Sequence, residues 1–521
     1  MKVLVLILSL VAACSIHSQI VLSDNPVFRV SQHDYKAKPG EEELFFSSDD
    51  QFAFRTPAGK ESHDYTFYNS QIEAVKRTSS TMQDFLPGEM TLLCVHNINN
   101  DLFGFAYHTD SKQKKNTIYC VSWNKEKFQF ENEVVILELS GNQYFKKLGE
   151  GFPGISVSKN DSKILFSIKD NSSKSPLQFL TKVFASDLTT LEEFTVVLED
   201  NGPMLPYSSK WEGEASLYYR YDRNMDNPFS IDDEGTIAFK GENKEKVAFV
   251  GFAANGKTNF ILFPNQSGVV AYDPIIFQPD GAERFWIGRL RYYEDSGKSE
   301  YEVSETESGR IQNSYLLEWN NELLREVENL SDFEYGKRLK DSEYLTMSNS
   351  DMVYSKLSGD GELYLGFEDH FENYYQETTA VTESFWIAKY NIRSATLETA
   401  VVRKMARSGV PSYHKSYLVE KDNNLFVMFN DHPENIENPS AHEVVKTLGT
   451  VNPECPVALV AIDLETMRIG KRVHMWNTEA NNNIPLGPNR NPMFMLQDGS
   501  YCTMAMQFRQ KDRSLLRFEI K

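Results

Sequence analysis

Cysteine is scarce in this sequence, and its spacing excludes the common metal motifs. The 521 residues contain five cysteines, with no CxxC pair and no short spacing typical of zinc sites. Outside the N-terminal segment they are Cys94, Cys120, Cys455 and Cys502. All four lie in or beside apolar, strand-like runs, which favours small buried hydrophobic side chains. Export of the chain would permit an alternative, a disulfide between Cys455 and Cys502.

Motifs of the well-defined enzyme classes are absent. The sequence has no G-x-S-x-G elbow, no H-E-x-x-H, no P-loop and no G-x-G-x-x-G that opens a helix. An Asp or Glu pair for glycoside cleavage stays open, because 74 carboxylates leave many choices and spacing in sequence does not predict spacing in space.

Positive charge is in deficit. Lys and Arg number 54 against 74 Asp and Glu, so the formal net charge is −20, and no basic stripe interrupts it. Such a field repels phosphate backbones, and we expect no nucleic-acid partner.

Long apolar runs are also absent beyond the N-terminus, so the sequence predicts no transmembrane segment. Lys2 and the eleven-residue apolar run Val3–Ala13 are typical of a signal peptide, and the run is too short to span a bilayer. We expect an exported protein, periplasmic or extracellular.

Two cleavage sites compete in this segment. Ile16-His17-Ser18 is typical of an ordinary signal-peptidase site and predicts a signal peptide over residues 1–18. Val11-Ala12-Ala13-Cys14 resembles a bacterial lipobox; it would end the signal at residue 13, place a lipid on Cys14 and make the protein an outer-membrane lipoprotein.

The sequence does contain many short apolar runs separated by Asp, Asn, Gly and Pro. This pattern is typical of an all-β protein, whereas helical periodicity is scarce. One hairpin recurs eight times: a strand, an Asp/Asn/Gly turn, and a second strand rich in aromatic and β-branched residues. The turns centre on Asp50, Asn100, Asp161, Asp233, Asp280, Asp360, Asp422 and Asp498, at a mean spacing of 64 residues.

A second hairpin follows most of these copies. Phe184–Leu191 matches Val460–Met467, and Ile387–Leu397 is a longer variant, while Tyr119–Glu126 and Leu316–Glu322 share Trp-Asn-x-Glu. Four antiparallel strands per repeat are the blade of a β-propeller. The sequence therefore predicts a single propeller domain over residues 19–521.

Eight blades are predicted, with seven as the alternative because the first repeat is the least complete. The last repeat stops at its third strand, Leu515–Ile520. Its missing strand could come from the N-terminus, for which Val27–Val30 is the candidate. This pairing would close the ring and cover an edge that invites aggregation.

The segment Phe277–Gly281 carries a Pro-Asp-Gly turn beside an apolar strand and resembles the bacterial TolB-like or PD40-like propellers. The resemblance covers the repeat turns, and other copies, such as Gln497–Gly499, depart from it. It implies periplasmic or surface binding, or a propeller beside a hydrolase domain. Because the propeller repeats account for residues 19–521, we expect no hydrolase domain in this sequence.

The pattern F-x-D-H-x-E-N occurs twice, at Phe367–Asn373 and Phe429–Asn435. Each histidine lies ten residues past its turn aspartate, which predicts equivalent second-to-third strand loops in neighbouring blades, on the rim opposite the Asp/Gly turns. Asp, His and Glu can bind metal ions, and His can act as a base; the alternative is a turn repeated by duplication. The candidate ligand-binding residues are Asp369, His370, Glu372, Asp431, His432 and Glu434.

Two further segments are candidates for the same rim. Asp222, Asn224, Asp226 and Asp233 have the oxygen spacing of a calcium loop, although Asn227 stands where that loop needs glycine. The cofactor stays open; if the candidate residues of this rim bind a metal ion, that ion would be calcium or zinc.

The polar loop from Trp476 to Arg490 offers one aromatic ring and one guanidinium group, which suit glycan or peptide recognition. An ordinary long inter-blade loop is the alternative interpretation.

Two functions are compatible with this sequence. The first is a non-catalytic binding or scaffolding module for a protein, peptide or glycan. The second is a metal-assisted hydrolase or lyase that uses carboxylates and His370 or His432. Propellers host both, so the fold does not choose between them. The absence of specific catalytic motifs favours binding.

Overall fold

The computed structural model describes the chain from Ile20 onward, with gaps. The described ranges are 20–24, 28–35, 43–48, 50–59, 62–148, 153–158, 160–172, 177–198, 229–231, 235, 237–242, 248–254, 257–262, 270–277, 284–292, 310–319, 324–329, 334–337, 344–346, 350–358, 361–373, 379–391, 394, 396–408, 416–435, 440–441, 444, 446, 448, 455–475, 493–505 and 513–521. Within these ranges the chain forms strands and short 3₁₀ helices without an α-helix. Accordingly, no described helix is long and apolar enough to cross a membrane.

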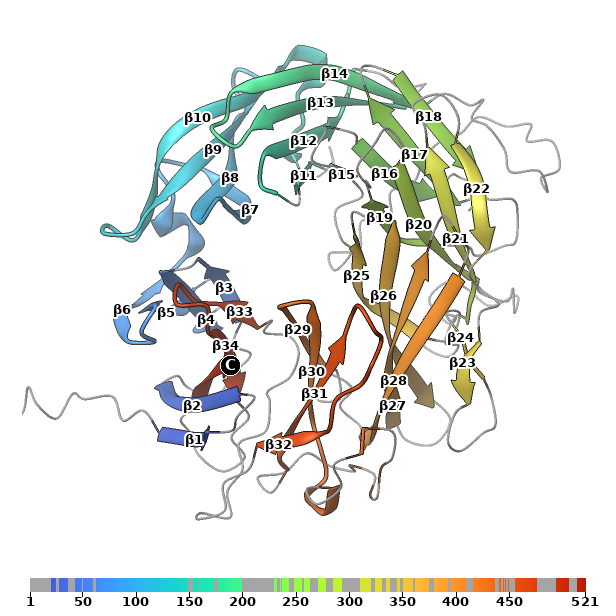
Figure 1. Ribbon diagram of the computed structural model, residues 1–521. Coiled ribbons are helices and arrows are strands. Elements are labelled where there is room, and N and C mark those ends of the chain that lie inside the picture. Colours follow the sequence, from blue (N-terminus) through green and yellow to red (C-terminus); the bar gives the residue numbers. More distant parts are fainter. Residues whose placement is uncertain are drawn as a thin grey trace, which may run out of the picture. The chain divides into compact units, whose positions relative to one another are not determined.

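The chain divides into two compact units. Unit 1 comprises Met1–Phe85 and Val402–Lys521, and unit 2 comprises Leu86–Val401. Both are built from antiparallel sheets in which strands follow one another in chain order, except in one sheet of unit 1 that pairs strands from the two ends of the chain (Figure 1).

Unit 1 contains three sheets. The first is β3 (Glu43–Ser47), β4 (Gln51–Pro57), β5 (His63–Asn69) and β6 (Ala74–Ser80). The second is β29 (Tyr417–Lys421), β30 (Asn424–Asn430), β31 (Val457–Asp463) and β32 (Val473–Met475). The third has five strands in the order β1 (Ile20–Asp24), β2 (Phe28–Tyr35), β35 (Arg513–Ile520), β34 (Tyr501–Ala505) and β33 (Phe494–Met495).

Unit 2 begins with two sheets whose side chains are largely described. One is β7 (Thr91–Ile98), β8 (Asp101–Asp110), β9 (Lys115–Asn124) and β10 (Gln129–Ser140). The next is β11 (Gly154–Val157), β12 (Lys163–Lys169), β13 (Leu177–Ala185) and β14 (Thr190–Leu198). The 3₁₀ helix η2 (Gly141–Gln143) follows β10, whereas η1 (Met82–Phe85) follows β6 in unit 1.

The remaining sheets of unit 2 repeat the pattern. They are β15 (Phe229–Ile231), β16 (Ile237–Glu242), β17 (Ala248–Ala254) and β18 (Lys257–Leu262); then β19 (Val270–Phe277), β20 (Arg284–Tyr292), β21 (Arg310–Trp319) and β22 (Leu324–Asn329). A two-stranded ribbon follows, β23 (Glu334–Lys337) with β24 (Tyr344–Thr346). The last sheet is β25 (Ser350–Leu357), β26 (Glu362–Asn373), β27 (Thr379–Asn391) and β28 (Thr396–Ser408), and the boundary with unit 1 falls inside β28.

These sheets confirm the all-β prediction. Each of the eight repeated turns joins the first two strands of a sheet, from β3–β4 to β33–β34. A series of four-stranded antiparallel sheets is the arrangement of β-propeller blades.

The turn residues explain why these hairpins form where they do. Asn99 and Asn100 have φ of 50° and 67°, and Asp422 and Asn423 have φ of 50° and 61°. Asn and Asp tolerate this left-handed region, which tight hairpin turns require. The carboxylate of Asp161 also accepts the Asn99 N–H at 3.1 Å, so one repeated turn is bonded to the next.

Alternation along β35 places side chains in two cores of unit 1. Leu515 packs with Phe52 and Phe54 of β4, together with Cys502. Leu516, Phe518 and Ile520 point to the opposite face and pack with β29, β30 and β31. The ammonium group of Lys421 adds a 2.5 Å hydrogen bond to the carbonyl of Ile520. β35 is thus covered on both faces by its neighbours in unit 1.

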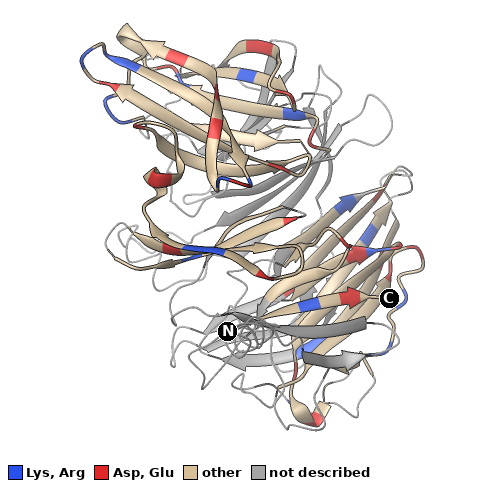
Figure 2. Ribbon diagram, turned by 90° about the vertical axis from the view of Figure 1, so that its left-hand side faces the viewer, with Lys and Arg blue, Asp and Glu red and all other residues tan. Residues whose placement is uncertain are grey.

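Unit 2 has the same construction in its described core. Phe105, Ile118 and Cys120 of the β7–β10 sheet pack with Ile164 and Phe166 of β12. Lys and Arg segments alternate with Asp and Glu segments over the described sheets (Figure 2). Ion pairs between neighbouring strands use some of these charges, as in Lys182 with Glu193 at 2.9 Å.

The four cysteines that the structure describes are free thiols, so the disulfide alternative for Cys455 and Cys502 is wrong. Both are fully buried, as the apolar context predicted, and Cys502 belongs to the core around Phe52. Burial raises the pKa of Cys94 and Cys120 to about 12. These thiols are packing residues in the protonated form.

The predicted N-terminal partner of the last strand is observed. β2 pairs with β35 over eight consecutive residue pairs, from Phe28 with Ile520 to Tyr35 with Arg513. The strand is longer than the expected Val27–Val30, and β1 adds a further strand outside it. The edge of β35 is therefore covered within unit 1.

A proline in β2 tests this pairing. β2 has a strand on each side, so replacing Val30 by proline removes a ladder donor and should lower the free energy of unfolding by about 3 kcal/mol. The matched control, Val30→Thr, keeps the N–H and a β-branched side chain and should stay close to wild type. Chemical denaturation measures both, and equal stability of the two variants would contradict the pairing.

Candidate functional site

The second copy of the D-H-x-E-N motif lies where the sequence predicted it. β30 ends at Asn430, and Asp431 to Asn435 follow, with Pro433–Asn435 forming the 3₁₀ helix η6. This is the end of β30 opposite the Asp422 turn. The motif therefore opens the connection between the second and third strands of its sheet.

The first copy does not have the same local structure, so the expectation of equivalent loops is wrong. β26 continues to Asn373 and contains the motif, with a bulge between Glu368 and His370 and with His370 opposite Thr382 of β27. The candidates in this copy, Asp369, His370 and Glu372, are thus strand residues.

One substitution between the copies accounts for the difference. Phe371 stands in the first copy where Pro433 stands in the second. Phenylalanine favours a strand and keeps its N–H for the ladder, whereas proline has no N–H and ends the pairing. The duplicated sequence therefore gives an extended hairpin once and a 3₁₀ turn once.

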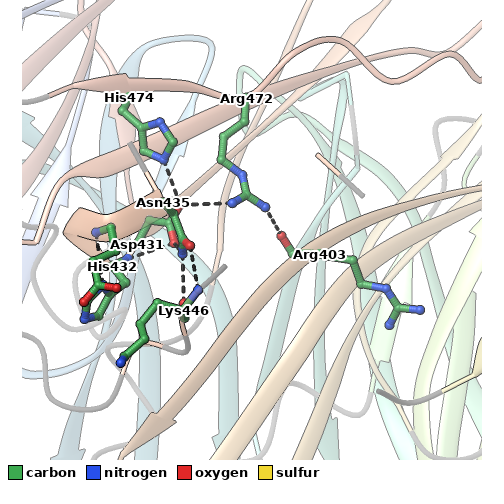
Figure 3. Close-up of polar contacts among 8 residues, drawn as sticks. Arg403, Asp431, His432, Asn435, Lys446, Arg472 and His474 are labelled. Atoms are coloured by element: carbon green, nitrogen blue, oxygen red, sulfur yellow. Dashed lines mark hydrogen bonds and ion pairs between the residues drawn. The ribbon is translucent and has the colours of Figure 1, made fainter. Parts of the chain in front are cut away.

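The carboxylate of Asp431 is the centre of a buried polar cluster (Figure 3). Oδ1 accepts the backbone N–H of His432 at 2.8 Å and Nδ2–H of Asn435 at 2.6 Å. Oδ2 accepts Nε2–H of His474 at 2.8 Å and Nη1–H of Arg472 at 3.3 Å. Each oxygen therefore has two donors, and the side chain is only 2% exposed.

Arg472 is the buried positive charge of this cluster. Its side chain is 0% exposed and lies 5.9 Å from the ring centroid of Phe429. Nη2 donates to the carbonyl of Arg403 at 2.5 Å, whereas Nε has no hydrogen-bond partner in the described part of the chain. Pairing with Asp431 offsets the large cost of burying this guanidinium group.

The surroundings of Asp431 keep it ionised. Burial raises the pKa of this carboxyl, but the hydrogen bond from His474, the charge of Arg472 and the hydrogen bond from Asn435 together lower the pKa below its ordinary value of 3.8. At neutral pH the cluster is therefore a salt bridge with a fixed carboxylate.

Asn435 connects the cluster to the far side of the loop. Its Nδ2–H donates to the carbonyl of Lys446 at 2.9 Å, and its Oδ1 accepts the N–H of Lys446 at 2.9 Å. Asn435 is fully buried. The side-chain amide thus bonds Lys446 as a neighbouring strand would.

The imidazole of His432 is held by its own turn. Nδ1 accepts the N–H of Glu434 at 3.1 Å. A nitrogen that accepts this bond is unprotonated, so the proton of the neutral ring is on Nε2. Neither nitrogen is then a free base or a free metal ligand: Nδ1 is occupied and Nε2 is a donor.

The arrangement is therefore a structural cluster that presents a hydrogen-bond donor, and it does not have the ligands of a metal centre. Asp431 has no lone pair left for an ion or a substrate proton. Among the described residues there is no group of three or more His, Cys, Asp or Glu that could hold a metal ion.

The other sequence candidates lie outside the description of side chains. Those of Asp369, His370 and Glu372 are not described, and the remaining positions lie outside the described residues altogether: Cys14, Asp222, Asn224, Asp226, Asp233, Trp476 and Arg490. Their predicted roles stay predictions.

Sequence reasoning missed Arg472 and His474, the two residues that hold Asp431. They are separated by one residue near the start of β32, which puts them on the same side of that segment. The sequence signal for them is the charged R-x-H pattern of Arg472 to His474, at the start of the fourth strand of its sheet. Nothing in the spacing connects it to a motif about 40 residues earlier.

No known family matches this sequence, and no curated protein matches it. Solved structures with low similarity include the β-propeller domain of the Trilobed protease from Pyrococcus furiosus, at 10% identity over 85% of this chain and 99% of that one, with a TM-score of 0.31. An α-L-arabinanase from Penicillium chrysogenum gives 10% identity, 87% and 99% coverage and a TM-score of 0.28. A lignostilbene dioxygenase from Pseudomonas brassicacearum gives 8% identity, 88% and 92% coverage and a TM-score of 0.36. None of these likenesses is close enough to support an argument about this chain.

The salt bridge of Asp431 gives a stability prediction. Asp431→Asn leaves Arg472 buried without its counter-charge and should cost about 3–5 kcal/mol of unfolding free energy. Because the folded-state pKa of Asp431 is lowered, its stabilisation is complete above the ordinary carboxyl pKa and is lost as the pH falls through the lowered value. The difference between wild type and variant should therefore persist down to about pH 4 and shrink below it.

Asp463→Asn is the matched control, because the Asp463 carboxylate accepts backbone N–H groups of its turn and an amide oxygen can do the same. Denaturation curves from pH 3 to pH 7 measure both variants. Equal stability of the two would show that the Asp431 cluster contributes nothing to folding.

Proposed function

We propose that this chain is an exported, non-catalytic binding module: an eight-bladed β-propeller, closed by its N-terminal strand, that holds a protein, peptide or glycan on the rim of the second-to-third strand loops. Residues 1–18 would be its signal peptide, with a lipid on Cys14 as the alternative.

Repetition supports the eight-bladed ring. Eight copies of the first hairpin each start a sheet of four or five strands, and the β23–β24 ribbon stands outside this series. The pairing of β2 with β35 supports closure, because it completes the last sheet with a strand from the other end of the chain.

The observation that carries the non-catalytic assignment is the saturation of Asp431. A general base needs a free lone pair, and a metal ligand needs the same. Both oxygens of Asp431 and Nδ1 of His432 are already engaged by protein donors. A saturated cluster stiffens the loop on which it lies, which is what a binding surface requires.

The ligand class follows from the groups on the proposed rim. Trp476 can stack on a sugar or a peptide side chain, and Arg490 and the Nε2–H of His432 can donate hydrogen bonds. The resemblance of the repeat turns to TolB-like propellers, which implies binding in the periplasm or at the surface, supports the same assignment.

Metal analysis tests the non-catalytic half of the proposal. We expect the purified protein, after dialysis, to contain less than one equivalent of zinc or calcium, and we expect EDTA to leave its melting temperature unchanged. Stoichiometric metal that is lost in a His432→Ala variant would instead favour the metal-assisted hydrolase or lyase.

Binding to glycan and peptide arrays tests the proposal that the rim holds a ligand. On immobilised glycans and peptides, Trp476→Ala should weaken binding about thirtyfold, the effect of removing a contact worth roughly 2 kcal/mol. Gln497→Ala is the control, because Gln497 is exposed beside the Asp498 turn, on the opposite rim. Equal loss in both variants, or no binding to either array, would argue against a ligand on the proposed rim.

A further inference from the structure

The turn at His432 contains a hydrogen bond that depends on protonation. His432 holds η6 through three bonds: its N–H donates to Asp431 Oδ1, its carbonyl accepts the N–H of Asn435 at 2.9 Å, and its Nδ1 accepts the N–H of Glu434. The first two bonds use the backbone. The third requires an unprotonated ring nitrogen.

We propose that η6 is an acid-sensitive switch: protonation of His432 removes the acceptor of the Glu434 N–H and loosens the loop that Asn435 ties to Lys446. A protonated imidazole carries N–H groups on both nitrogens, so Nδ1–H would face the Glu434 N–H, donor against donor. The ring must then turn away. The side chain of His432 is partly exposed, so the proton and the rotated ring can both reach solvent.

The direction of the pH effect follows from this bond. The neutral ring accepts the Glu434 N–H and the charged ring cannot, so the bond is present at neutral pH and is lost on acidification. Histidine is the side chain that ordinarily changes charge between about pH 5 and 8. Mildly acidic solution is therefore the condition in which to test the switch.

The other charged groups around the turn do not produce this response. The pKa of Asp431 lies below its ordinary value, so Asp431 stays ionised in mild acid. His474 directs Nε2 at Asp431 Oδ2, and a protonated His474 would keep that donor and gain charge attraction. Arg472 keeps its charge throughout. Glu434 and Lys446 are exposed, and their bonds to His432 and Asn435 use backbone groups.

The consequence of the switch extends beyond one residue. Asn435 lies in the same 3₁₀ turn and bonds both Asp431 and the backbone of Lys446. Loosening η6 therefore weakens the connection across the loop. Release of a ligand on acidification would follow, and that consequence rests on the proposed function, whereas the switch itself is measured on the free protein.

Hydrogen exchange tests the switch. Peptides covering residues 429–446 are followed by mass spectrometry at pH 7.5 and pH 5.5, after correction for the intrinsic exchange rate. In wild type, exchange at Glu434 and Asn435 should rise roughly twofold to tenfold at the lower pH, the range expected for loss of one hydrogen bond. Peptides from β4 should not change, and they report that the fold is intact.

Two substitutions at the same position separate titration from structure. His432→Asn supplies an amide oxygen two residues before the Glu434 N–H, which is the geometry of an Asx turn, and that oxygen does not titrate. Its exchange should stay slow at both pH values. His432→Ala has no acceptor, and its exchange should be fast at both.

The outcomes are decisive in either direction. A pH-dependent wild type together with two pH-independent variants establishes the switch. A wild type without pH dependence would overturn it. Retention of the acid response in His432→Asn would also overturn it, and the His474→Gln variant would then show whether His474 is the titrating group.

Discussion

β35 has apolar side chains on both of its faces, and each face must be covered by another sheet. β35 shows this constraint within three residues, because Leu515 enters the core shared with β4, and Leu516 and Phe518 enter the core shared with β29 and β30. A single sheet of this kind cannot remain folded in water. Repetition of the sheet along the chain meets this requirement, because each copy can bury the apolar face of the preceding one.

The Asp431 cluster buries charged groups, and apolar residues in the same place would cost less desolvation free energy. Ionised groups away from water are stable only when they are paired with an opposite charge and hydrogen-bonded. The two oxygens of Asp431 meet four donors, and their donors in turn fix η6 and the chain at Arg403. This polar cluster fixes the turn at η6, and Asn435 bonds that turn to the backbone of Lys446.

The sequence predicts the hairpins well because their information is local. An Asp or Asn turn between two apolar runs specifies both strands, and all eight were found. The candidate site was predicted only in part. One residue, Pro433 in place of Phe371, decided between turn and strand, and the partners Arg472 and His474 come from a distant strand, so spacing does not reveal them.

The pairing of β2 with β35 also sets an order of events. Ribosomes make a chain from its N-terminus, so β2 emerges long before β35. Until then the edge of β2 that pairs with β35 exposes unpaired backbone, and the contact that joins the two strands spans nearly 500 residues, from Phe28 to Ile520. Such non-local pairing forms slowly and leaves aggregation-prone edges open meanwhile. Until β35 has been made, the unpaired edge of β2 must therefore be kept from pairing with other chains.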